Sequence, residues 1–147
     1  SSDLGHEYER NHKNSLRKCV LLAEDDVDDV EFLTACLQNL DQAIEIRVFS
    51  SGDQTISYFE NLSNDQLPGL ISREYNLPAI NGCQILTVLA ENERYRTIPK
   101  IIWSTSNSSF FENECMDRGA SAYFVKPADL SGYVNLAEKV VEYLRGK

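Results

Sequence analysis

The chain has 147 residues, the size of a single domain of about 100–200 residues. It carries 14 Lys and Arg against 23 Asp and Glu, and the formal net charge of −9 disfavours binding to nucleic-acid phosphates or anionic membranes. No apolar run reaches the roughly 20 residues of a membrane span, and the first residues do not form a secretory signal. We therefore expect a cytoplasmic protein without a nucleic-acid or membrane partner.

The start of the chain divides into a leader and a structured domain. Residues 1–16 are polar and of mixed charge, typical of a flexible leader, so the domain is expected at 17–147. A continuous apolar run at 19–23, ended by acids, predicts a buried parallel strand. The following helix should bury Val30, Leu33, Leu37 and Leu40, with Asp26 or Asp28 as its N-cap.

The same alternation of apolar runs and amphipathic segments continues to the end of the chain. Further strands are predicted at 44–49, from 70 onward, at 101–103 and at 122–125. Helices should lie between them, one of which buries Ile85, Leu86 and Leu89, and a less regular one spans 106–118. The last helix, capped by Asp129, is expected to bury Leu130, Val134, Ala137, Val141 and Leu144. Five strands alternating with five helices predict an α/β fold, a parallel sheet covered on both faces.

Four cysteines are spread along this pattern without the spacing of a zinc site, and neither histidine lies near one of them. Disulfides are rare in the cytoplasm, so we expect reduced, mostly buried thiols that pack as small apolar side chains. They are Cys19, Cys36, Cys83 and Cys115.

Polar residues follow four of the predicted strands. They are Glu24, Asp25 and Asp26 after the first strand, Glu74 after the third, Ser104 and Thr105 after the fourth, and Lys126 and Pro127 after the fifth. Ligands of open parallel sheets bind at the carboxyl ends of the strands. Carboxylates suit Mg²⁺, and a hydroxyl and an ammonium group would bind phosphoryl oxygens. Acids after one strand can be mere helix caps, but four matching strand ends favour a phosphoryl site.

At these residues the chain resembles the receiver domain of two-component response regulators. The motifs are LLAEDD, EYNLPAING, IIWSTS and AYFVKP, and the resemblance covers the chain from Lys18 to about Arg145. It implies a CheY-like, flavodoxin-like doubly wound sheet with strand order 2-1-3-4-5, and the STS sequence resembles stand-alone receivers. It also implies a non-enzymatic signalling module whose partners are a sensor histidine kinase or phosphotransfer protein and a downstream protein that binds the 106–124 face.

The resemblance assigns roles to individual positions. Glu24, Asp25, Asn76 and the acceptor position Glu74 would hold Mg²⁺, with Asp25 as the direct ligand and Asn76 acting through its carbonyl; Asp26 is the neighbouring third acid. Ser104 and Tyr123 are the switch residues. Ser104, Thr105 and Lys126 would bind the phosphoryl group, and Pro127 would follow a cis peptide bond.

The chain departs from the family at the phosphoacceptor position, where Glu74 replaces Asp. The additional C–C bond, about 1.5 Å, displaces the carboxylate, and a displacement of ~1 Å can cost ~10²-fold in rate. We therefore expect impaired or absent phosphoacceptance and weak or no Mg²⁺ binding. Arg73, just before it, either reaches solvent along its long stem or offsets the acidic cluster and reduces the need for Mg²⁺.

Two other functions remain as alternatives. The first is a pseudo-receiver, the same fold acting as a phosphorylation-independent binding module. The second is a Mg²⁺-dependent phosphatase of similar topology, which is disfavoured because the sequence Glu24-Asp25-Asp26-Val27 does not match the DxD nucleophile motif of such enzymes.

Overall fold

A computed structural model describes residues 18–61, 68–74 and 82–146, with the backbone alone at 73, 74, 82 and 83. The predicted leader at 1–16, Asn76 and the loop at 77–81 lie outside the described residues. Within the described part, no helix combines the length and apolar composition that crossing a bilayer requires.

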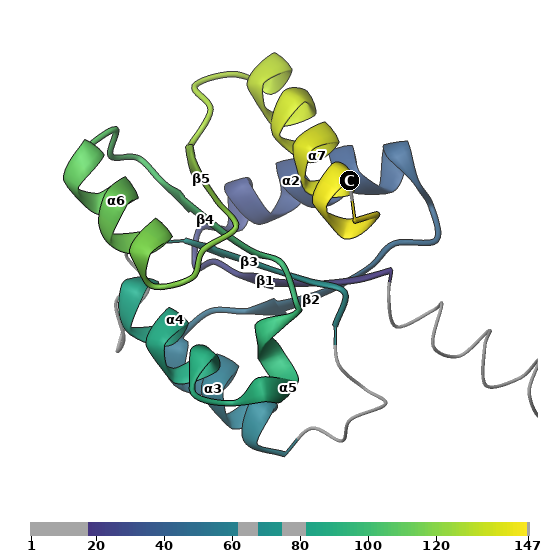
Figure 1. Ribbon diagram of the computed structural model, residues 1–147. Helices are drawn as coiled ribbons and strands as arrows, with labels where there is room; N and C mark the ends of the chain where they lie inside the picture. The colour runs from purple at the N-terminus through teal and green to yellow at the C-terminus, as the bar shows by residue number, and fades with distance from the viewer. Residues whose placement is uncertain (1–17, 62–67, 75–81, 147) are drawn as a thin grey trace, which may run out of the picture.

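Five parallel strands form one sheet in the order β2-β1-β3-β4-β5, which confirms the predicted fold (Figure 1). The strands are β1 (Cys19–Ala23), β2 (Glu45–Phe49), β3 (Leu70–Glu74), β4 (Lys100–Ser104) and β5 (Ala122–Val125). All residues of β1 and β4 are buried, as expected of strands covered on both sides, whereas the edge strand β2 has none that is fully buried.

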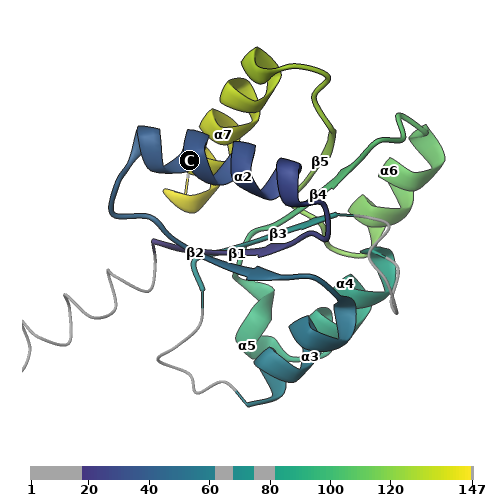
Figure 2. The same ribbon diagram turned by 180° about the vertical axis from the view of Figure 1, so that it is seen from behind.

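Helices cover both faces of the sheet (Figures 1 and 2). Two of them, α2 (Val27–Leu40) and α7 (Leu130–Leu144), pack together on one face. The other face carries α3 (Gly52–Glu60), α4 (Gly82–Ala90), α5 (Glu93–Arg96) and α6 (Ser109–Asp117). The described residues thus form six helices rather than the five predicted, because the single-turn α5, capped by Asn92, lies between α4 and β4.

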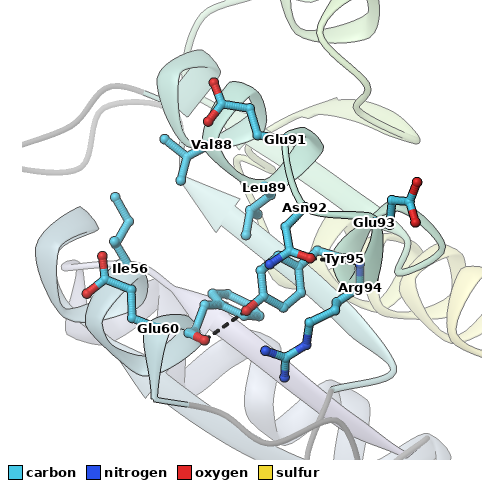
Figure 3. Close-up of a pocket in the computed structure, with 10 residues that line it drawn as sticks. Ile56, Glu60, Val88, Leu89, Glu91, Asn92, Glu93, Arg94 and Tyr95 are labelled. Carbon is cyan, nitrogen blue, oxygen red and sulfur yellow. Dashed lines mark hydrogen bonds between the residues drawn. The ribbon is translucent and has the colours of Figure 1, made fainter.

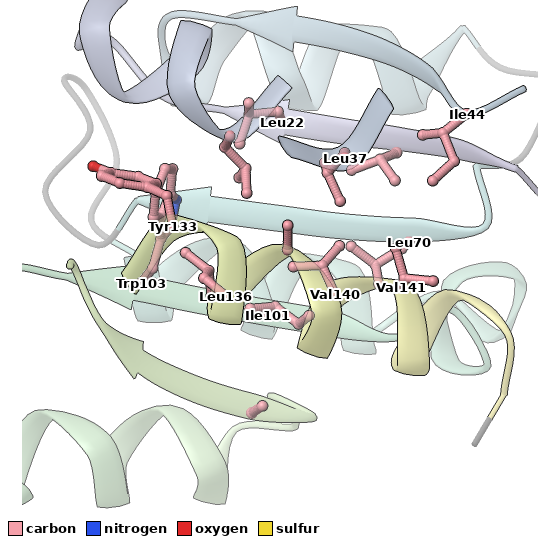
Figure 4. Packing of buried hydrophobic residues seen from close by; sticks show 14 residues of the cluster. Leu22, Leu37, Ile44, Leu70, Ile101, Trp103, Tyr133, Leu136, Val140 and Val141 are labelled. Atoms are coloured by element: carbon pink, nitrogen blue, oxygen red, sulfur yellow. The ribbon is translucent and has the colours of Figure 1, made fainter. Parts of the chain in front are cut away.

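The largest apolar cluster lies between the sheet and the α2–α7 pair (Figure 4). Leu22, Leu70 and Ile101 come from three adjacent strands and meet Leu37 of α2 and Val140 of α7. Close packing of this kind fixes the two helices over the sheet. It thereby determines where their N-terminal turns lie relative to the strand ends.

The predicted buried face of α7 was wrong in its N-terminal half. Leu130 and Val134 are exposed by 62% and 41%, while Tyr133 and Leu136 are buried. The prediction considered aliphatic residues alone, whereas Tyr133 buries its aromatic ring and directs its hydroxyl to a polar partner on α2. The first turns of α7 therefore turn a different face toward the sheet than the predicted one.

Two smaller expectations were also wrong. Leu40, at the end of α2, is 41% exposed, although Leu33 and Leu37 are buried as predicted. The helix predicted at 106–118 begins only at Ser109, because Ser106 and Ser108 donate their backbone N–H groups to serine hydroxyls two residues earlier. Such local side-chain contacts compete with helical hydrogen bonds.

The described cysteines agree with the expectation of reduced thiols. Cys19 and Cys115 are buried, Cys36 is half-buried, and none of the three forms a disulfide. Burial raises the pKa of the Cys19 and Cys36 thiols, so they stay protonated and poorly nucleophilic at neutral pH.

Candidate functional site

The carboxyl ends of four strands lie side by side at one edge of the sheet. The parallel register places Ala23 of β1 beside Arg73 of β3, and Glu74 beside Trp103 of β4. Glu24 follows Ala23 directly, so its backbone reaches the same level as that of Glu74. The sheet therefore brings three of the predicted strand ends together. The fourth, at the end of β5, joins them through the side chain of the residue that follows this strand.

That side chain is Lys126, which connects β5 to the acids after β1. Its Nζ lies 3.0 Å from Oε2 of Glu24 and 5.1 Å from the centre of the Trp103 ring. Glu24 is buried, and its Oε1 accepts the backbone N–H of Asp26 at 3.0 Å. A buried carboxylate needs a cationic or hydrogen-bonding partner, and Glu24 has both.

Lys126 has a second acidic partner that the sequence analysis did not identify. Its Nζ donates to Oδ2 of Asp29, in the first turn of α2, at 2.7 Å. The other oxygen of Asp29, Oδ1, accepts the hydroxyl of Tyr133 from α7. Burial and the Asp29 carboxylate raise the pKa of Tyr133 well above its usual range, so this hydroxyl remains a donor.

Asp29 lies in the first turn of α2, where the helix dipole favours an acid whatever it contacts. Neither its position four residues after Asp25 nor its immediate neighbours indicate its contacts, because its partners Lys126 and Tyr133 lie 97 and 104 residues away in the sequence. The role of Tyr133 cannot be predicted from the sequence, because the aliphatic residues around it in α7 do not indicate whether its ring is buried.

The predicted switch residues occupy connected positions. The hydroxyl of Ser104, the last residue of β4, accepts the backbone N–H of Ser106 at 3.1 Å, and the backbone N–H of Lys126 donates to the Ser104 carbonyl at 2.7 Å. The Tyr123 hydroxyl donates to the Ser106 carbonyl at 2.8 Å. The half-buried Tyr123 thus ties β5 to the loop after β4, whereas Thr105 is exposed.

The prediction of a cis peptide before Pro127 was wrong. Among the described residues no peptide bond is cis, so the Lys126–Pro127 bond is trans. An X–Pro bond prefers trans by only about 0.5–1 kcal/mol, so the sequence alone does not decide the isomer. Pro127 packs closely against Gly132 of α7, where an added Cβ would come within 2.6 Å of the proline Cβ.

The predicted Mg²⁺ ligands fall into described and undescribed positions. Asp25 is exposed and Glu24 is held by Lys126, while the Glu74 side chain and Asn76 lie outside the described residues. Within the described part, no group of three His, Cys, Asp or Glu side chains is arranged to hold a metal. Of the described predicted ligands, only Asp25 is open to solvent.

A hollow of about 580 Å³ lies elsewhere, between α3, α4 and α5 (Figure 3). Its floor includes Leu89 and Tyr95, whose hydroxyl donates to the Phe59 carbonyl at 2.8 Å. Glu60, Glu91 and Glu93 lie around it. These helices cover the sheet face opposite α2 and α7, so the hollow is separate from Lys126.

The α6 side of the molecule carries the predicted interaction face. Phe110 is 70% exposed, while the adjacent Phe111 is half-buried against the cluster around Leu86 and Cys115. Of this pair, only Phe110 therefore offers most of its ring to solvent. Met116 is also partly exposed on this helix.

Known proteins share this sequence pattern and fold. Residues 20–138 match the family described as the response regulator receiver domain. The rice (Oryza sativa subsp. japonica) two-component response regulator ORR5 is 27% identical over 115 residues, which cover 78% of this chain and 85% of that protein. The Arabidopsis thaliana two-component response regulator-like APRR9 is 31% identical over 121 residues, 82% of this chain but 25% of that protein.

A solved structure agrees with these sequence relatives. The response regulator RPA3017, described from red light signaling of R. palustris, superposes with a TM-score of 0.75 at 27% identity, covering 85% of this chain and 92% of that one. The family match spans both the LLAEDD and the AYFVKP motifs, whose Glu24 and Lys126 meet in the structure. The chain therefore belongs to the response regulator receiver domain family of two-component signalling.

Proposed function

We propose that this receiver acts in phosphorelay signalling with impaired or absent phosphoacceptance, because Glu74 stands at the acceptor position. The observation that carries the proposal is the meeting of Glu24 and Lys126, 3.0 Å apart, at the edge of the sheet where β3 ends in Glu74. A lysine can stabilise the charge on a transferring phosphoryl group, and a carboxylate beside it can help to hold the accompanying metal ion. The family membership supplies the partners: a sensor histidine kinase or a phosphotransfer protein.

The metal requirement follows from the same geometry. Lys126 already neutralises part of the charge of Glu24 and Asp29, so among the described predicted ligands the attraction left for Mg²⁺ comes largely from Asp25. We propose weak Mg²⁺ binding in which Asp25 is the direct ligand. In a Mg²⁺ titration, Asp25→Asn should abolish the binding, and equal affinity in both proteins would contradict the assignment.

The experiment that tests phosphoacceptance is intact mass spectrometry after incubation with acetyl phosphate and Mg²⁺. In an active receiver, a carboxylate oxygen attacks the phosphorus, the phosphorus–oxygen bond to acetate breaks, and acetate leaves. We expect no mass increase in the wild type and addition of one phosphoryl group in Glu74→Asp. Modification of the wild type at the rate of Glu74→Asp would contradict the proposal.

The alternative of a pseudo-receiver is supported by one of the relatives. APRR9, at 31% identity, is named response regulator-like rather than response regulator. A binding module of this kind would use an exposed face, and α6 offers Phe110. If Glu74→Asp also fails to accept a phosphoryl group, the site lacks more than the acceptor residue and the pseudo-receiver is the better description.

We further propose that the downstream partner binds the face formed by residues 106–124. Aromatic side chains are enriched at the centres of protein interfaces, and Phe110 is the most exposed large apolar side chain of the described residues. Tyr123 links this face to Ser104 through Ser106. These contacts, each between a side-chain hydroxyl and the backbone of Ser106, would connect occupancy of the strand ends with the shape of this face.

A further inference from the structure

Lys126 is held by one acid outside the receiver motifs, and that acid is fixed in turn by a tyrosine. Asp29 binds its Nζ at 2.7 Å, and Tyr133 binds the other oxygen of the same carboxylate. Tyr133 is itself fixed, since its ring is buried and packs edge-on against Trp103 at 6.4 Å and in a tilted orientation against Phe32 at 5.5 Å. The carboxylate of Asp29 therefore has both oxygens engaged and little freedom to turn.

The ammonium group of a lysine has three hydrogen-bond donors. Glu24 and Asp29 both lie within 3.0 Å of Nζ, so an anion arriving at the strand ends competes with two carboxylates for this cation. Glu24 is part of the acidic motif and lies beneath the site. Asp29 belongs to α2 and draws Lys126 toward the α2–α7 side.

We propose that Asp29, oriented by Tyr133, is a positioning residue that restrains Lys126 and limits its access to an anion at the strand ends. This inference rests on the proposed phosphoryl-binding role of Lys126. It assigns to the α2–α7 face a part in setting the anion affinity of the site. Opening the Asp29–Lys126 contact would leave Oδ1 of Asp29 bound to the Tyr133 hydroxyl, so the α2–α7 contact keeps this carboxylate in place to compete again for Lys126.

The chain contains a reporter for the position of Lys126. Trp103 is its single tryptophan, and the Lys126 ammonium lies 5.1 Å from the indole ring. A cation at this distance over a ring interacts with its π-electrons, so withdrawal of Lys126 should change the fluorescence of Trp103. Lysine ¹⁵Nζ NMR signals report the same event directly, because ammonium protons held in charge-assisted contacts exchange slowly with water.

The decisive comparison is between Asp29→Asn and Asp28→Asn, titrated with inorganic phosphate at a fixed Mg²⁺ concentration. Both variants lose one acid of the same helical turn, but Asp28 is exposed while Asp29 contacts Lys126. A charge-assisted contact of this kind corresponds to about tenfold to a hundredfold in an equilibrium constant. We expect Asp29→Asn to bind phosphate at least about tenfold more tightly than the wild type, and Asp28→Asn to change the affinity by less than about threefold.

Tyr133→Phe provides a second variant that keeps every charge and removes only the hydroxyl bound to Asp29. It should move the phosphate affinity and the Lys126 NMR signal in the same direction as Asp29→Asn, by a smaller amount. Equal phosphate affinity in the two aspartate variants, undetectable binding by Asp29→Asn, or an unchanged Lys126 signal in that variant would each overturn the proposal. These readouts involve no covalent step, so they are separate from the acetyl phosphate test of Glu74.

Discussion

Replacing Lys126 with Met should destabilise the protein far more than removing a surface lysine. The side chains of Lys126, Glu24 and Asp29 are exposed by only 11%, 0% and 17%, so the methionine variant leaves two carboxylates close together with little water. Breaking a buried ion pair from one side costs about 3–5 kcal/mol, and we take about 3 because Asp29 still reaches solvent. Methionine preserves most of the packing against Trp103, so the loss reports the charge rather than a cavity.

The magnitude can be measured by urea unfolding or by thermal melting. A loss of about 3 kcal/mol lowers the melting temperature of a domain of this size by about 6–12 °C. The matched control is Lys139→Met, since Lys139 pairs with Glu142 at 3.7 Å but both side chains are more than half exposed. That change should stay within about 0.5 kcal/mol of the wild type.

A combined variant tests whether the unpaired carboxylates, rather than the loss of the lysine side chain, cause the destabilisation. Adding Glu24→Gln and Asp29→Asn to Lys126→Met removes the uncompensated carboxylates, which are the cause of the expected loss. We expect the triple variant to recover most of the loss. If Lys126→Met alone costs less than about 1 kcal/mol, the cluster behaves like an exposed ion pair and the reasoning fails.

Three further outcomes follow from individual contacts. Gly132→Ala should lower the free energy of unfolding, because the new Cβ would lie 2.6 Å from the Cβ of Pro127. Without this clash, alanine would stabilise a helix by about 1 kcal/mol relative to glycine. Asn135→Ala, at an exposed position of the same helix, controls for helix propensity in the same unfolding assay. Phe110→Ala should leave the free energy of unfolding within about 0.5 kcal/mol of the wild type, whereas Phe111→Ala should cost about 1 kcal/mol or more. Equal losses in the two variants would contradict the difference in burial between the two rings. The raised pKa of Tyr133 means that folding favours the protonated hydroxyl. The stability that this hydroxyl contributes is fully present below the unfolded pKa of about 10 and is lost as pH rises through the folded pKa. The difference in free energy of unfolding between the wild type and Tyr133→Phe should therefore shrink at alkaline pH, and a difference that grows there would contradict the reasoning.

The fold could be predicted because its signals are local and repeated. The apolar run 19–23 is buried at every position, and Ile85, Leu86 and Leu89 are buried as their helical spacing predicts. Asp26 and Asp129 cap α2 and α7 as expected, because capping depends on residues only three positions apart. Each of these signals involves neighbours in the chain.

The parts that failed depend on tertiary contacts. The rotation of α7 follows from Tyr133 reaching Asp29, a contact between residues 104 positions apart. The late start of α6 follows from the serine hydroxyls after β4, which compete with the helix for backbone N–H groups. The motif positions Glu24 and Lys126 were identified from the sequence, but their shared partner Asp29 lies outside the motifs and became visible only through packing.

The charge balance at the strand ends gives Lys126 a role in folding beside its proposed role in binding an anion. Residues 24–29 contain five acids, and the described contacts give them one cation, Lys126, which binds the two least exposed of the five. The exposed acids, Asp25 among them, are screened by water and salt, so they do not require a partner to fold. A phosphoryl anion would need the same cation that Glu24 and Asp29 hold, and bringing it close without new positive charge would be opposed by all five acids. A metal ion at Asp25 would supply such charge without disturbing Lys126. We therefore expect Asp25 to control whether an anion can approach, and Asp29 to control whether Lys126 can meet it.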